Sequence, residues 1–202
     1  MRIAVHEARA LPAGLAAQVA ALEAQAWPGS APGHDPALRP KAVLLVDEDG
    51  SVLASLALLY KPVRLADGRT YRAAGLSGVV TRADVRGRGH GARLVAAARA
   101  ELAADPAVDL ALFSCDRDLV PFYGAAGFEV LPGTVLVGGT PQDPLATDAP
   151  GLGKTVLAAF FTGDGDGAGA GSGDDEGRTD QVRTAFTGIR VPLYPGTIDR
   201  LW

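Results

Sequence analysis

Alternating apolar and polar positions predict several β-strands in the first half of the chain. Residues 2–7 alternate as a half-buried strand does. Two runs rich in strand-forming residues then flank Glu48-Asp49-Gly50, a sequence typical of a hairpin turn. Asp67-Gly68 marks another turn before the next apolar run. The strands predicted in this way are residues 2–7, 41–47, 51–60 and 71–80, the last three being antiparallel.

Apolar residues at intervals of three and four predict two long helices. The first follows Pro12, which suits the first position of a helix, and ends near Trp27. The second begins near Gly89 and stops before Asp105-Pro106, because the residue before proline disfavours helix. The other predicted elements are a strand at 109–114, a short helix at 120–126, the last strands of the core sheet at 134–137 and 155–161, and a strand-like run at 182–192.

One segment differs in composition from the rest. Residues 163–177 read GDGDGAGAGSGDDEG and contain no aromatic or β-branched side chain. Such a segment cannot bury enough apolar surface to order itself, so we expect a flexible Gly/Asp-rich loop at 163–180. The total length of 202 residues suits one sizeable core, and residues 1–202 are predicted to form a single domain.

Composition and charge narrow the classes of function. The net charge of −4 makes nucleic acid a poor partner. The three histidines, His6, His34 and His90, lack ligand spacing, so no metal site is expected. Cys115 is the only cysteine; it excludes an intrachain disulfide, and with no histidine nearby it is interpreted as a packed residue. The sequence shows neither a signal peptide nor a run long enough to cross a membrane, so a cytoplasmic location is the expectation.

The stretch that carries chemistry is residues 76–94, LSGVVTRADVRGRGHGARL. An apolar run ends at Thr81, a glycine-rich turn follows at 86–91, and a helix-like run comes next. Glycines allow a close backbone approach, and the first turn of a helix leaves N–H groups unpaired at its positive end. This order predicts a site for phosphate or pyrophosphate, with further positive charge from nearby arginines.

Two known glycine motifs do not fit this turn. A P-loop needs a Lys-Ser/Thr pair after its last glycine, and the turn lacks one. A dinucleotide fingerprint needs G-x-G-x-x-G, whereas Gly87, Gly89 and Gly91 alternate with single residues. What remains is R-x-x-G-x-G, formed by Arg86, Gly89 and Gly91 directly after an apolar strand.

This motif resembles the acetyl-CoA signature of the GCN5-related N-acetyltransferase (GNAT) superfamily. Residues 122–128, FYGAAGF, resemble the F-Y-x-x-x-G-F segment of the same family and follow the next strand as expected. The resemblance implies an α+β fold with a mixed, mostly antiparallel central sheet, splayed at the acetyl-CoA site and flanked by helices. It also implies an acetyl-CoA-dependent N-acetyltransferase.

The resemblance assigns roles to particular residues. The backbone of the turn would hold the pyrophosphate, and an N–H of Val79 or Val80 would stabilise the oxyanion, an effect worth about 3–4 kcal/mol. Gly78 fits a bulge that frees such an amide. Tyr123 is the candidate general acid for the thiolate; the alternative is a core tyrosine with a satisfied hydroxyl. The turn residues in question are Arg86, Gly87, Arg88, Gly89, His90 and Gly91.

The acceptor is a harder question. Residues 79–87, VVTRADVRG, are most similar to aminoglycoside 2'-N-acetyltransferases, as is an aspartate close before a terminal tryptophan. The resemblance implies a cationic small-molecule amine, an aminoglycoside or amino sugar, and makes Asp199 and the Trp202 carboxylate candidates for the acceptor pocket. The Trp202 carboxylate would also be a catalytic group, accepting the ammonium proton directly or through water. Asp199 is either an acceptor contact or an exposed aspartate in a fraying tail. Ser77, which stands where that family has glutamate, and Gly78 are further candidates. Asp35, in the loop 28–40, is either an acceptor contact or a solvated aspartate.

Other functions remain open. One is acetylation of a protein or peptide amine, and another is a non-catalytic acyl-CoA-binding module. A homodimer is also open. The partners expected are the small-molecule amine and acetyl-CoA, without nucleic acid or membrane.

Overall fold

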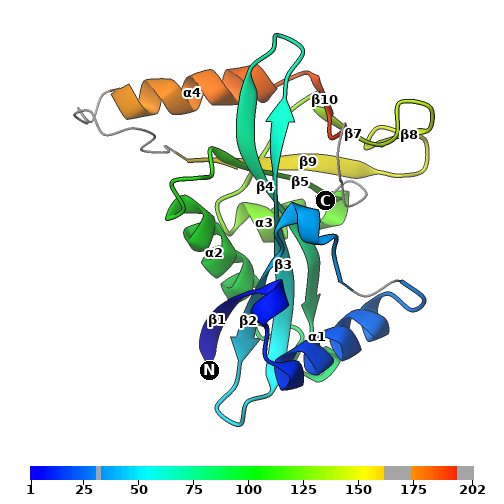
Figure 1. The fold of residues 1–202 in the computed structure, drawn as a ribbon, viewed down its shortest axis with the longest axis vertical. Coiled ribbons are helices and arrows are strands. Elements are labelled where there is room, and N and C mark those ends of the chain that lie inside the picture. The colour runs from blue at the N-terminus through cyan, green and yellow to red at the C-terminus, as the bar shows by residue number, and fades with distance from the viewer. Residues whose placement is uncertain (31–32, 162–173, 195–202) are drawn as a thin grey trace.

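The structure, a computed structural model, describes residues 1–30, 33–161 and 174–194 (Figure 1). In this part of the chain a seven-stranded sheet has the order β1-β2-β3-β4-β5-β9-β6, and a three-stranded sheet has the order β10-β7-β8. The strands are β1 (Arg2–Glu7), β2 (Lys41–Val46), β3 (Val52–Arg64), β4 (Thr70–Thr81), β5 (Leu110–Asp116), β6 (Glu129–Val130), β7 (Val135–Gly139), β8 (Pro144–Ala146), β9 (Lys154–Phe160) and β10 (Arg190–Pro192). The helices are α1 (Ala13–Ala26), α2 (His90–Ala103), α3 (Val120–Gly124) and α4 (Asp174–Phe186), with 3-10 turns at Ala8–Ala10, Pro36–Leu38, Ala83–Val85 and Arg117–Leu119.

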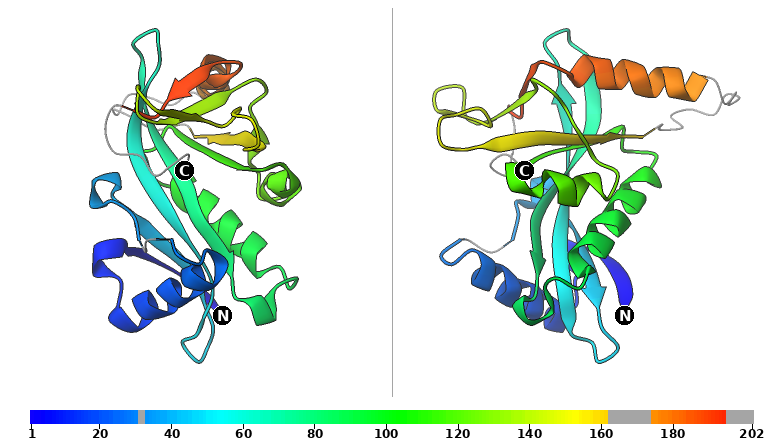
Figure 2. Two further views of the ribbon diagram at one scale, coloured as in Figure 1. Left: turned by 90° about the vertical axis from the view of Figure 1, so that its right-hand side faces the viewer. Right: turned by 180° about the vertical axis from the view of Figure 1, so that it is seen from behind.

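Strands β1 to β4 form an antiparallel unit covered by one helix on each face (Figure 2). Side chains alternate across a strand, so β2 supplies both faces. Ala42, Leu44 and Val46 belong to the apolar cluster that packs with α1, whereas Val43 and Leu45 belong to the cluster that includes α2. The strands and the two helices predicted for this half of the chain are confirmed, and the mixed, mostly antiparallel sheet matches the predicted fold class.

The junction between β4 and β5 is short and parallel. The two strands pair only at Ala73 with Leu110 and at Ala74 with Ala111. Both strands then continue, β4 paired with β3 and β5 with β9, without pairing with each other. The sheet therefore opens between β4 and β5, as the resemblance implied.

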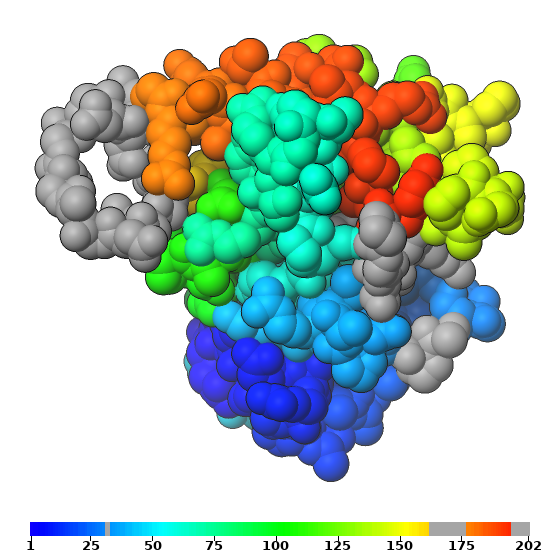
Figure 3. Space-filling model, turned by 45° about the horizontal axis from the view of Figure 1, so that its top comes forward, coloured from blue at the N-terminus to red at the C-terminus, as the bar shows by residue number. Residues whose placement is uncertain are grey.

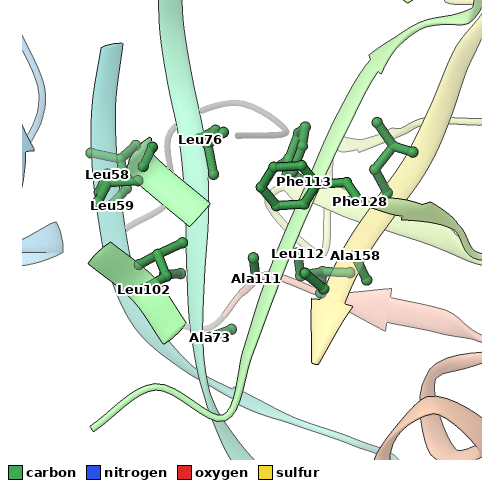
Figure 4. Packing of buried hydrophobic residues seen from close by; sticks show 14 of the residues in the cluster. Leu58, Leu59, Ala73, Leu76, Leu102, Ala111, Leu112, Phe113, Phe128 and Ala158 are labelled. Carbon is green, nitrogen blue, oxygen red and sulfur yellow. The ribbon is translucent and has the colours of Figure 1, made fainter. Parts of the chain in front are cut away.

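Aromatic side chains pack strand β5, on one side of this opening, against helix α3. The ring of Phe113, on β5, meets Tyr123 of α3 edge to face at 5.0 Å between ring centroids and meets Phe128 at 5.1 Å. Figure 4 shows Phe113 projecting from β5 among the other core residues. Full burial of such a ring contributes about 1.5–3 kcal/mol, and each edge-to-face pair adds about 0.5–1.5 kcal/mol. Strand β5 and helix α3 are thus held together as a rigid support.

Two sequence predictions were wrong for the C-terminal part of the chain. Residues 174–186 form α4, although a loop was predicted up to 180 and a strand-like run from 182; only β10 of that run is a strand. The helix is stabilised by tertiary packing, because Phe186 is fully buried and meets Tyr71 at 5.1 Å. Figure 3 shows α4 lying beside the β3–β4 hairpin. The remainder of the predicted flexible loop, 163–173, lies outside the described residues.

The strand predicted at 134–137 is not part of the core sheet, contrary to the prediction. It forms most of β7, which belongs to the small sheet rather than to the core sheet. Thr134 explains the connection, since its hydroxyl donates to the Phe186 carbonyl at 2.6 Å and accepts from the Gly188 N–H at 3.1 Å. These bonds tie β7 to the end of α4. The strand predicted at 155–161 is confirmed as β9 of the main sheet. Within the described residues, no helix has both the length and the apolar character needed to cross a membrane.

Candidate active site

A bulge interrupts β4 beside the opening. Ser55 pairs with Val80 and Ala57 with Ser77, so one residue of β3 lies opposite two residues of β4. Gly78 takes a φ of +59°, the left-handed conformation that glycine adopts without strain in such bulges. The bulge predicted at Gly78 is therefore confirmed. Because a bulge disrupts the ladder locally and β5 has already diverged, backbone groups near Val79 are available to a ligand.

The glycine-rich turn follows directly and leads into α2. Gly87 and Gly89 have φ values of +76° and +80°, and Gly89 is the N-cap of α2 with no side chain bonded to the helix end. Arg86 donates from Nε to the Thr81 carbonyl at 3.0 Å, which closes the turn onto the end of β4. The first N–H groups of α2 and the positive end of its dipole thus remain for an anion.

Gly91 brings α2 close to both β4 and α3. A Cβ at this position would lie 3.1 Å from the Thr81 Oγ1 and 3.4 Å from the ring of Phe122. Any larger residue would push these neighbours apart. This approach joins the turn, the end of β4 and the aromatic segment into one wall.

A cavity of about 530 Å³ lies at this meeting point. Its size falls within the range of small-molecule sites, ~300–1,000 Å³. Among the candidate residues, those that line it are Val79, Val80, Arg86, Gly87, Gly89, His90, Gly91 and Tyr123. The lining therefore brings a row of backbone amides, an arginine and a phenol into one hollow. Arg88 is exposed and does not line the cavity.

Tyr123 lies at the inner end of this arrangement. Its side chain is buried against Phe113, Phe122 and Phe128. Burial, with smaller contributions from Cys115 and Asp116, raises the pKa of the phenol well above its ordinary value. The hydroxyl therefore stays protonated at neutral pH and can donate a proton or a hydrogen bond to a group in the cavity.

Cys115 is placed as a core residue. Its side chain is buried, and burial together with the Asp116 charge raises the pKa of the thiol to about 11. A thiol of this kind is uncharged at neutral pH and therefore a poor nucleophile. Among the described residues, no group of three His, Cys, Asp or Glu side chains is arranged to hold a metal ion.

The candidate acceptor residues lie apart from the cavity lining. Asp35 accepts from the Ala37 N–H at 2.8 Å and thereby caps the Pro36–Leu38 turn. Ser77 is partly buried in β4, opposite Ala57. Gly78, at the bulge, faces the carboxylate of Glu23 on α1. Asp199 and Trp202 lie outside the described residues.

Several lining residues had no signal in the sequence. Ala26 and Trp27, from the end of α1, and Leu119, before α3, line the cavity. Trp27 and Leu119 are each 42 % exposed, and both line the same cavity. Nothing local in the sequence joins the end of α1 to the glycine turn. An apolar residue left exposed beside a cavity is a signal that only the folded chain gives.

The whole arrangement has a counterpart in a known family. Residues 7–131 match the family described as Acetyltransferase (GNAT) domain, and the chain belongs to this family. It is accordingly an acyl-CoA-dependent acetyltransferase, since acetyl-CoA is the usual cosubstrate of the family. No curated protein matches the chain significantly.

Solved structures support the same fold. The GNAT family N-acetyltransferase YhbS from Escherichia coli, in complex with CoA, is 16% identical with a TM-score of 0.58, over 96% of this chain and 89% of that one. Escherichia coli ElaA is 13% identical with a TM-score of 0.56, over 78% and 99%. An aminoglycoside 6'-N-acetyltransferase complexed with coenzyme A is 14% identical with a TM-score of 0.52, over 82% and 100%. At these identities the likeness is one of fold.

Proposed function

We propose that this chain transfers an acetyl group from acetyl-CoA to a primary amine of a small cationic molecule, with an aminoglycoside or amino sugar as the first class to test. The observation that carries the proposal is the single cavity bordered by the glycine turn, the bulged strand β4 and Tyr123. A phosphate site, an amide donor and an acid in one hollow are the groups that acetyl transfer requires.

The chain's own residues fit the donor molecule. The amides between Gly87 and Gly91, at the positive end of α2, would bind the pyrophosphate, and Arg86 lines the same wall. The extended arm of the donor would lie between β4 and β5 beyond Ala74, where the two strands no longer pair. Bound acetyl-CoA supplies the activated acetyl group as a thioester.

The bulge and the phenol would act on two atoms of the thioester, its carbonyl oxygen and its sulfur. A backbone N–H of Val79 or Val80 would face the carbonyl oxygen and stabilise the charge that develops on it, an effect worth about 3–4 kcal/mol. Tyr123 lines the cavity and is protonated at neutral pH, so it would donate its proton to the departing sulfur.

The acceptor is proposed from the sequence. Residues 79–87 and the C-terminal pair Asp199 and Trp202 resemble those of aminoglycoside 2'-N-acetyltransferases. Acidic groups in an acceptor pocket complement a polycationic substrate. We therefore place the aminoglycosides first in the search for a substrate, followed by simpler amino sugars.

The test is release of CoA from acetyl-CoA, with products identified by mass. Tobramycin carries a 2'-amine and kanamycin A carries a hydroxyl there, so the pair reports on the acetylated position. Tyr123→Phe is expected to lose turnover by at least tens of fold while binding acetyl-CoA as before. Tyr71→Phe, which removes a hydroxyl from a tyrosine packed on Phe186, is the matched control. Equal turnover in the two variants would remove Tyr123 from the mechanism, and binding without turnover on any amine would favour a binding module.

A further inference from the structure

A second cavity lies beside the bulge, on the face of the sheet covered by α1. Its volume is about 310 Å³, close to the lower end of the range for small-ligand sites, ~300 Å³. Its walls are mostly apolar and come from Ala8 and Leu11, α1, the start of β2 and β3, together with Gly33 and His34 of the loop after α1. Leu56 and Ala57 of β3 line it, and these residues lie opposite the bulged part of β4. The cavity is therefore next to the place where acetyl transfer is proposed.

Glu23 projects from α1 between this second cavity and the bulge. It lines the cavity, and its Oε1 lies 3.5 Å from the point that a Cβ on Gly78 would occupy. One turn further along α1, Ala26 and Trp27 line the donor cavity. Helix α1 and the residue after it thus contribute to both cavities, and Gly78, which Glu23 approaches, directly precedes Val79 in the lining of the donor cavity.

The surroundings of Glu23 are those of a proton acceptor. Burial raises the pKa of its carboxyl above the ordinary value of 4.5, although the charge of His34 and the Gly33 N–H act in the opposite direction. Lys41 also lines the cavity, but it forms ion pairs with Glu101 and Asp105 at 3.7 Å each. A carboxylate with increased proton affinity in a mainly apolar hollow attracts a cationic amine.

We propose that Glu23 binds the acceptor ammonium in this second cavity and accepts its proton, so that the free amine attacks beside the Gly78 bulge. The role assumes the acetyl transfer proposed above and narrows its acceptor. The cavity holds one ring-sized primary amine, either a small amine or one ring of an aminoglycoside whose remainder stays outside.

The steps balance as follows. The Glu23 carboxylate takes one proton from the ammonium, and the nitrogen then forms a bond to the acetyl carbon as the bond from that carbon to sulfur breaks. Tyr123 gives its proton to the sulfur, and the nitrogen loses its second proton, which restores the phenol. The products are the N-acetylated amine and CoA thiol, and Glu23 releases its proton to solvent.

Glu23→Gln tests the assignment with almost no change of shape. With tobramycin and glucosamine as acceptors, kcat/KM for the amine at pH 7 is expected to fall about 100-fold or more. The neighbouring oxygen atoms of an amino sugar hold the pKa of its amines below the roughly 10.4 of a lysine side chain, so the defect is expected to shrink as the pH rises from 7 to 9.5 and the acceptor loses its proton unaided. Glu48→Gln is the matched control, because it removes the same charge from a side chain that is 94% exposed.

A readout other than turnover separates a chemical role from a structural one. Trp27 lines the donor cavity, so quenching of its fluorescence reports acetyl-CoA binding. Glu23→Gln is expected to keep the wild-type Kd for acetyl-CoA, and Glu23→Asp, with a carboxylate withdrawn by one methylene, should retain part of the turnover.

Three results would overturn the assignment in distinguishable ways. Wild-type kcat/KM in Glu23→Gln removes Glu23 and leaves the proposed function intact. Loss of acetyl-CoA binding in Glu23→Gln and Glu23→Asp makes the residue structural. Wild-type protein that binds acetyl-CoA but acetylates no amine overturns the proposed function, and the role of Glu23 with it.

Discussion

A pair of glycine substitutions tests the left-handed turn before α2. Gly89 and Gly14 are both exposed, and a Cβ at either position would meet nothing within 4 Å. The two sites differ in their backbone, because Gly89 has a φ of +80° whereas Gly14 lies inside α1. The same added methyl group should therefore have opposite effects on stability.

The expected magnitudes follow from this difference. Alanine in the left-handed region costs about 1–2 kcal/mol, so Gly89→Ala should destabilise the protein by that amount. Gly14→Ala should stabilise it by about 0.5–1 kcal/mol, since alanine is the better residue within a helix. A difference of about 2 kcal/mol corresponds to a gap in Tm of about 4–8 °C for a protein of this size.

Thermal and urea unfolding of the two variants and the wild type measure the gap, and acetyl-CoA titration adds a second readout. Gly89 lines the donor cavity, so Gly89→Ala should also weaken acetyl-CoA binding, whereas Gly14→Ala should not. If both variants gained stability equally, the turn before α2 would not be left-handed, and the amide site built on it would lose its basis.

Three further predictions concern ionisable groups. Folding raises the pKa of Glu23, so this carboxyl group favours the folded state most below pH 4.5 and progressively less as the pH rises. Urea titrations should therefore show that Glu23→Gln increases the free energy of unfolding, relative to wild type, by more at pH 7 than at pH 4. Burial of Asp109 raises the pKa of its carboxyl group, but the hydrogen bonds from Arg72 outweigh burial and bring this pKa below 3.8. Asp109 therefore contributes to the free energy of unfolding above pH 3.8, and this contribution is lost as the pH falls further. Asp109→Asn should therefore cost about 1 kcal/mol at pH 7, a loss that chemical unfolding would show to vanish in acid; a constant difference would contradict the pairing. Cys115, with a thiol pKa of about 11, should react with iodoacetamide far more slowly in folded than in unfolded protein at pH 8, as mass spectrometry would show, and equal rates would mean that it is exposed.

The parts of the fold that the sequence could predict have strong local signals. Strands β1 to β4 alternate or carry turn residues at their ends, and α1 and α2 have helical periodicity. Helix α4 was missed because a Gly/Asp-rich run precedes it and its order depends on Phe186 packing against Tyr71, residues far apart in the chain. The sheet to which β7 belongs likewise depends on the distant partner β10.

In the candidate site, too, the sequence could predict one part and not the other. Its donor side follows from one continuous stretch, the bulge at Gly78 and the glycine turn, so the motif alone indicated it. Its other wall comes from Ala26 and Trp27, at the end of the alanine-rich helix α1, with no motif around them. Their relevance arises only when α1 packs across β4, which no local pattern reports.

The contact at Gly91 lies beside the opening of the sheet. Because β4 and β5 share only the pairs at Ala73 and Ala74, few ladder hydrogen bonds fix the angle at which they diverge. Packing of the neighbouring elements adds to these bonds, and at Gly91 helix α2 meets both Thr81, at the end of β4, and Phe122 of α3. A side chain at position 91 would have to displace Thr81 or Phe122, so this glycine sets how close α2 lies to the end of β4 and to α3 without itself being one of the reacting groups.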